Sequence, residues 1–118
     1  MRDELMRIFA NWEKELEKNE WYFSDCYEEL TMNLAPFEAF SAIPDVISVL
    51  LTVKDSFLLN ETIDFLDTLY IIADTTEIHP MLQAECENIR LHIQRFGDNH
   101  SHVAWKVLKR MLRISEMP

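Results

Sequence analysis

The sequence is poor in the residues that build tight turns and phosphate-binding loops. It contains one glycine and four prolines among 118 residues, whereas a β-rich fold needs many turn residues. A glycine-rich phosphate loop is excluded for the same reason, because Gly97 is the only glycine. We therefore expect a fold built from helices, without a nucleotide-binding loop.

Long apolar runs and cysteine frameworks are also missing. The longest apolar candidate, 43–53, is interrupted by three polar or helix-breaking residues and falls short of the roughly 20 apolar residues that span a bilayer. Acids in the first turn of the chain argue against a secretory signal. Cys26 and Cys86, the only cysteines, are then expected to be reduced and buried. These absences predict a cytoplasmic protein without a membrane segment.

Basic residues are nearly absent from the middle of the chain. The net charge of −10 divides into −1 over 1–18, −13 over 19–89 and +4 over 90–118, and Lys54 is the only base in the middle segment. Such a charge attracts basic proteins and repels nucleic acid and anionic membranes. A purely solubilising surface is the alternative explanation. We interpret the acidic middle as a partner surface.

Apolar residues recur at steps of three and four along most of the chain, which is the periodicity of amphipathic helices. The pattern predicts six helices, at 2–18, 24–34, 44–53, 56–75, 77–96 and 99–114. Phe37 and Phe40 are expected in a short connecting turn, and Gly97 is expected to end the fifth helix in the left-handed conformation. Val103 and Val107, with Met111 and Ile114, form the predicted core stripe of the last helix.

Short turns between these helices imply antiparallel neighbours in a single all-α domain covering 1–118. From Pro44 onward, the paired helix lengths favour two hairpins stacked side by side, as in HEAT- and armadillo-like solenoids. A compact six-helix bundle is the alternative architecture.

Patterns typical of catalysis or metal binding are weak. His100 and His102 are two residues apart, a spacing that places them on different sides of a helix. The acids between 61 and 74 lie along a single helix, whereas metal sites in helical bundles take ligands from several facing helices. We therefore expect no enzymatic activity, no metal and no cofactor.

The acids of the 56–75 helix recur at steps of three and four and share one side of it. Tyr70 and Ile71 offer an apolar contact inside that acidic rim, since aromatic and apolar residues dominate binding hot spots. Acids of the 24–34 helix extend the patch if the two helices are neighbours. The predicted partner-binding residues are Glu61, Asp64, Asp67, Tyr70, Ile71, Asp74, Asp25, Glu28 and Glu29.

With the acidic helix 60–74, the chain resembles small acidic all-helical bacterial immunity proteins of polymorphic-toxin and contact-dependent inhibition systems. The resemblance implies an immunity protein that binds a basic bacterial toxin, often a nuclease, and covers its active site with carboxylates. The implied partner is a basic protein, with no nucleic acid and no membrane, and the chain is expected to be a monomer or weak dimer. Two alternatives are a nucleic-acid-mimicking phage inhibitor of a host protein and a helical adaptor subunit.

Overall fold

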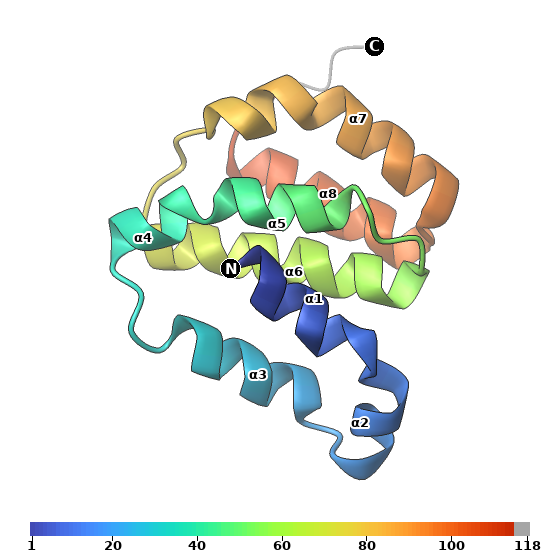
Figure 1. The fold of residues 1–118 in the computed structure, drawn as a ribbon. Coiled ribbons are helices and arrows are strands. Elements are labelled where there is room, and N and C mark those ends of the chain that lie inside the picture. Colours follow the sequence, from blue (N-terminus) through green and yellow to red (C-terminus); the bar gives the residue numbers. More distant parts are fainter. Residues whose placement is uncertain (115–118) are drawn as a thin grey trace.

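The computed structural model describes residues 1–114, and the regular secondary structure in that range is all helical (Figure 1). The predicted all-α fold is therefore confirmed. In chain order the helices are α1 (Arg2–Ala10), α2 (Trp12–Lys18), α3 (Tyr22–Thr31), α4 (Pro36–Ser41), α5 (Ile43–Leu50), α6 (Ser56–Ala73), α7 (Pro80–Phe96) and α8 (Asn99–Met111).

The longer helices form two layers. In one layer α5 packs between α1 and α7, and in the other α6 packs between α3 and α8 (Figure 1). The smallest dimension of the molecule is 20 Å, which corresponds to two helices of about 10 Å diameter each. The hairpins α5–α6 and α7–α8 are stacked, with α5 against α7 and α6 against α8. This is the stacked-hairpin arrangement predicted for the segment from Pro44 onward.

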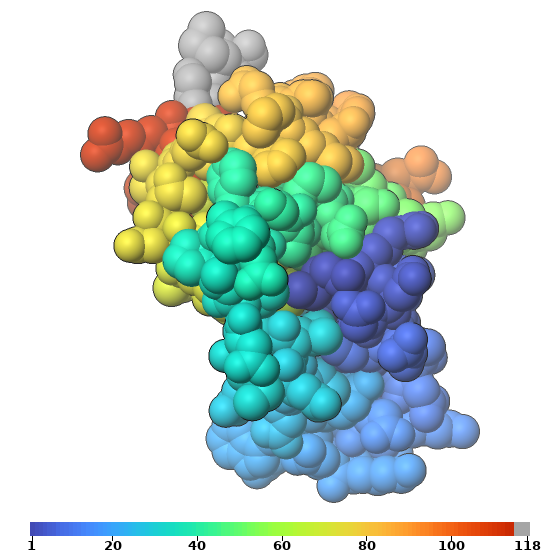
Figure 2. Space-filling view, turned by 60° about the vertical axis from the view of Figure 1, so that its left-hand side comes forward, coloured from blue at the N-terminus to red at the C-terminus, as the bar shows by residue number. Residues whose placement is uncertain are grey.

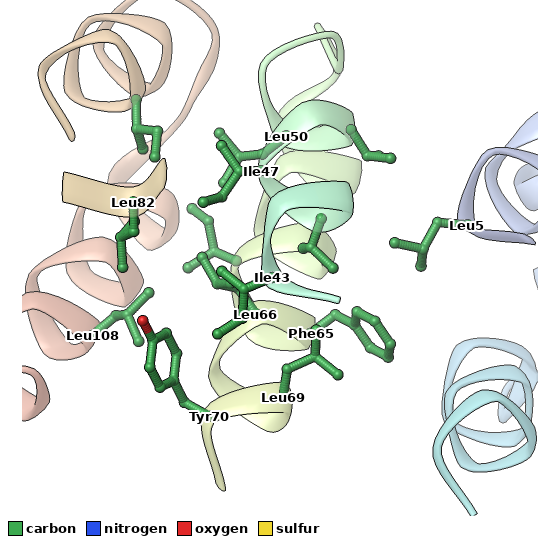
Figure 3. Packing of buried hydrophobic residues seen from close by; sticks show 14 of the residues in the cluster. Leu5, Ile43, Ile47, Leu50, Phe65, Leu66, Leu69, Tyr70, Leu82 and Leu108 are labelled. Carbon is green, nitrogen blue, oxygen red and sulfur yellow. The ribbon is translucent and has the colours of Figure 1, made fainter. Parts of the chain in front are cut away.

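The hydrophobic core lies between the two layers. It includes side chains from α1, α5, α6, α7 and α8, and Figure 3 labels at least one from each, among them Leu5, Ile47, Leu66, Leu82 and Leu108. Each of these side chains is at most 1% exposed. Because burying one such side chain stabilises a fold by about 1.5–3 kcal/mol, this shared core holds the hairpins to one another.

The N-terminal helix predicted over 2–18 is broken in two at Asn11, whose backbone (φ −132, ψ 35) is not helical. The break redirects α2 so that Trp12 stacks on Phe57 of α6, with ring centroids 4.8 Å apart. Tyr27 of α3 likewise lies against Phe65 of α6, at 4.8 Å. Figure 2 shows the segment with α2 and α3 as one end of the molecule. Contacts between aromatic rings thus join that end to α6.

Several other predicted boundaries were wrong in ways that capping explains. The residues around Phe37 and Phe40 form the short helix α4, because Pro36 opens it and the Glu38 carboxylate accepts the Ala35 backbone N–H at 2.9 Å. Helix α7 begins at Pro80 and not at 77, because the His79 Nδ1 atom accepts the Met81 N–H at 3.0 Å and caps the helix.

Gly97 does not adopt the predicted left-handed conformation, since its φ of −86 and ψ of 171 are those of extended backbone. A Cβ atom at this position would lie 2.6 Å from the Ile93 carbonyl oxygen and 2.8 Å from the Ser101 Cβ. Glycine is required here because the end of α7 and the first turn of α8 approach too closely for a side chain.

The predicted core stripe of the last helix was wrong at Val103 and Val107, whereas Met111 and Ile114 are half-buried and pack against the core. Val103 and Val107 are 53% and 55% exposed. The side chains of this segment that are buried are instead Ser101, Trp105, Leu108 and Leu112.

A polar cap at the start of α8 explains this rotation. The Asp98 carboxylate accepts the Ser101 N–H at 3.0 Å, and the Ser101 hydroxyl donates to the Asn60 side-chain carbonyl on α6. Ser101 is therefore held against α6, and the residues at helical spacing from it face the core. The two valines consequently face outward.

Candidate partner-binding surface

The acidic face of α6 consists of Glu61, Asp64 and Asp67. Helix α6 begins at Ser56 and is capped by Asp55, whose carboxylate accepts the Phe57 and Leu58 N–H groups at 2.8 and 3.1 Å. From this start, the three-residue spacing brings all three acids to one side, while most of the remaining circumference is buried. Asp64 is exposed, and Glu61 and Asp67 are half-buried. The structure therefore brings these three predicted residues together.

A groove runs between α6 and α8, beside the acidic face. Its volume is about 230 Å³, and it is lined by Asp64, Asp67, His100, Val103 and Val107 over a floor of Ile63, Ala104 and Leu108. The two helices are parallel, because Asn60 meets Ser101 at one end and Asp67 faces Val107 further along. The carboxylates of α6 and the exposed valines of α8 thus lie on opposite sides of one groove.

Burial in this surface raises the pKa of all three carboxyl groups. For Glu61, burial is the largest effect, the nearby Tyr27 hydroxyl opposes it, and the charge of Asp64 adds to it. For Asp64, burial is again largest, the neighbouring His100 lowers the pKa, and the charge of Asp67 raises it. Burial alone accounts for the raised pKa of Asp67. Ionising these groups therefore costs the folded protein free energy.

No cation of residues 1–114 offsets that cost by forming an ion pair with these acids. The groove lining contains no lysine or arginine within the same range. The basic residues of α8 near its end, such as Lys106 and Arg110, are not part of that lining. Within residues 1–114, the basic C-terminal segment therefore does not supply a partner to the acids of this face.

Tyr27 borders the acidic face from the α3 side. Its hydroxyl is buried near the Glu61 carboxylate and has no hydrogen-bond partner among the described residues. Burial, and then the charge of Glu61, raises the pKa of Tyr27. The acidic face is therefore bounded by an aromatic residue on one side and by valines on the other.

Tyr70 does not belong to the surface, contrary to the prediction. It is 1% exposed, and its hydroxyl accepts the His79 backbone N–H at 3.0 Å. Its neighbour Ile71 is 65% exposed and lies one turn beyond Asp67 on the same side of α6. Asp74 is exposed and ends α6 in the left-handed conformation, with φ of 54. Ile71 is therefore the apolar residue that continues the acidic face.

The acids of α3 do not all extend this patch, although α3 and α6 are neighbours. The Asp25 carboxylate accepts the Asn19 side-chain N–H at 3.1 Å, near the start of α3. Glu29 lines a separate groove of about 430 Å³ between α1 and α3, opposite Arg7. Glu28 is exposed. The prediction that Asp25 and Glu29 join the face of α6 was thus wrong, because Tyr27 occupies the side of α3 that meets α6.

Sequence reasoning missed the contributions of Tyr27, His100, Val103 and Val107. The two valines were assigned to the core because they repeat at a four-residue step. The helix cap formed by Asp98 and Ser101 is the sequence signal that could have shown the two valines to be exposed. It indicates that Ser101 faces the core, and Trp105 lies one turn further on the same face.

Other chemistry is not apparent in the residues that the structure describes. Among residues 1–114, no group of three or more His, Cys, Asp or Glu side chains is placed to hold a metal ion. Cys26 and Cys86 are half-buried free thiols, and burial raises the pKa of each. In the same range no helix is long and apolar enough to cross a membrane.

Comparison with protein-family models, with curated proteins and with solved structures finds no match for this chain.

Proposed function

We propose that this chain is a non-catalytic immunity protein, which binds a basic toxin domain through the acidic face of α6 and so neutralises it. The observation that carries the proposal is the set of three adjacent carboxylates, partly desolvated and not ion-paired with any lysine or arginine among residues 1–114, beside exposed valines. A fold gains no stability from such an arrangement. A partner that supplies lysine or arginine side chains gives these carboxylates the counter-charges that they lack.

The proposed mechanism is stoichiometric occlusion. A nuclease holds the phosphates of its substrate with lysine and arginine side chains. Glu61, Asp64 and Asp67 would pair with those side chains, and Ile71 and the valines of α8 would exclude water from around the pairs. Truncating one side of such a desolvated pair costs about 2–5 kcal/mol of binding free energy, so removing one of these carboxylates is expected to weaken binding strongly.

The test compares two double charge reversals that change the net charge equally. Asp64→Lys with Asp67→Lys alters the acidic face, and Glu13→Lys with Glu17→Lys alters exposed positions on α2. Each immobilised protein is exposed to an extract of the source cell, and bound proteins are eluted in a salt gradient. We expect the wild type and the α2 variant to retain one basic protein until high salt, and the α6 variant to lose it.

The activity of the retained protein is then titrated with the wild-type chain. Toxicity or nuclease activity that falls to zero at a fixed molar ratio supports the immunity function. A retained protein that binds nucleic acid without any toxic activity would instead indicate a nucleic-acid mimic. Equal retention by the α6 and α2 variants would refute the assignment of the acidic face.

A further inference from the structure

The groove between α6 and α8 combines carboxylates with exposed apolar side chains, which a purely acidic surface does not. One wall carries the carboxylates of Asp64 and Asp67, and the other carries Val103 and Val107. The valines are more than half exposed, although valine is a poorer helix former than alanine or lysine at a solvated helix position. Nothing within residues 1–114 covers them, so neither helix propensity nor core packing accounts for valine at these two positions.

We infer that the α6–α8 groove binds an amphipathic helix of the partner, an inference that rests on the function proposed above. The occupant carries apolar residues one turn apart, which contact Val103 and Val107. It also carries lysine or arginine residues along one edge, which pair with Asp64 and Asp67. Charge complementarity supports this occupant, since the groove lining holds carboxylates and no lysine or arginine within the described residues.

The spacing of the groove residues favours a helix over an extended segment. Val103 and Val107 are four residues apart, and Asp64 and Asp67 three, so the valine pair rises by about 6 Å and the aspartate pair by about 4.5 Å along its helix axis, which averages to about 5 Å. An incoming helix repeats its side chains on one face at a similar interval of about 5.4 Å. Residues on one face of a strand repeat at about 6.6–6.8 Å, so an extended segment would fall out of step with the aspartates of the α6 wall.

The size of the groove also favours side chains over an enclosed small molecule. Its volume of about 230 Å³ lies below the roughly 300–1,000 Å³ of typical small-ligand pockets. Side chains from a helix lying along the groove fit such a space. A third helix can pack its side-chain ridges into the groove between the neighbouring helices α6 and α8, as helices commonly pack against one another.

The test uses two synthetic peptides of 16 residues and identical composition, each of which is titrated into the full isotope-labelled chain. In the first peptide, leucine recurs at helical spacing with arginine along one edge, and in the second the same residues alternate as in a strand. We expect the helical peptide to bind at least tenfold more tightly. It is also expected to shift the amide resonances of Asp64, His100, Val103 and Val107 in nuclear magnetic resonance spectra.

Two double variants separate this inference from the proposed function. Val103→Ser with Val107→Ser alters exposed positions and is expected to leave thermal unfolding unchanged while weakening the helical peptide at least tenfold. Glu13→Lys with Glu17→Lys, the matched charge control, is expected to leave peptide binding within about twofold. Equal binding of the two peptides, or a serine variant that binds the helical peptide like the wild type, contradicts the inference that the groove binds a helix. If that happens while Asp64→Lys with Asp67→Lys still releases the basic protein, the proposed function stands and only the groove inference fails.

Discussion

Replacing Tyr70 with phenylalanine distinguishes a structural residue from a binding residue on the same helix. The Tyr70 side chain is 1% exposed, its ring lies edge-on to Phe40 with centroids 6.4 Å apart, and its hydroxyl accepts the His79 N–H at 3.0 Å. That hydrogen bond holds the residue that caps α7 against α6. Tyr70→Phe keeps the ring contact and removes only the acceptor.

The expected cost follows from what happens to the His79 N–H. A buried donor left without an acceptor costs about 1–3 kcal/mol. His79 is half-buried, so water reaches the N–H in part, and we expect a loss near 1 kcal/mol. For a chain of this length, that loss corresponds to a fall in melting temperature of about 3–5 °C.

The assay is urea unfolding of the full chain, monitored by tryptophan fluorescence, with binding of the proposed basic partner measured in parallel. Ile71→Ala is the matched control, because Ile71 is the adjacent residue and 65% exposed, and surface substitutions usually change stability by less than about 0.5 kcal/mol. We expect Tyr70→Phe to lower stability and retain binding, and Ile71→Ala to weaken binding and retain stability. Loss of binding by Tyr70→Phe at unchanged stability would refute the reasoning from burial.

Three further substitutions test the fold and the electrostatics by the same urea assay. Gly97→Ala is expected to destabilise, because a Cβ clash costing about 1–3 kcal/mol exceeds the roughly 0.4–1 kcal/mol gained by stiffening the unfolded chain. Equal or higher stability would mean that the turn at Gly97 is not crowded. Asp55→Ala removes the cap of α6 and is expected to cost about 1 kcal/mol, whereas Asp55→Asn should retain most of it. Burial raises the folded-state pKa of Glu61 above its ordinary value of 4.5. Glu61 therefore does not lower the stability of the folded protein below pH 4.5, where it is protonated in both states, and it does so as the pH rises through the raised pKa. Glu61→Gln is therefore expected to stabilise the protein at pH 7 and to change little near pH 3, and an equal effect at both pH values would contradict this.

Helix content could be predicted from local sequence, because periodicity and capping act within a few residues. The three-residue spacing of Glu61, Asp64 and Asp67 places them on one side of any regular helix, whatever packs around it. The cap at Asp55 marks the start of α6 for the same local reason. The stacking of the hairpins from Pro44 onward was also predicted, since short connections leave few ways for successive helices to pack.

The candidate surface could be predicted only in part, because α6 is apolar around most of its circumference. In such a helix, periodicity cannot identify which apolar residue lies at the edge of the buried region, and Tyr70 and Ile71 are adjacent in sequence. The same ambiguity affects α8, where one apolar face includes Trp105 and another includes Val103 and Val107.

The sequence by itself determined that this protein is helical and that its carboxylates gather on one face of α6, since both follow from spacing along a single helix. Only the tertiary structure decided which apolar residues meet solvent. The hydrogen bond between Ser101 and Asn60 sets the rotation of α8, and packing of α4 and α7 around α6 buries Tyr70. Both depend on residues distant in the sequence, whose contacts exist only once the helices have packed together.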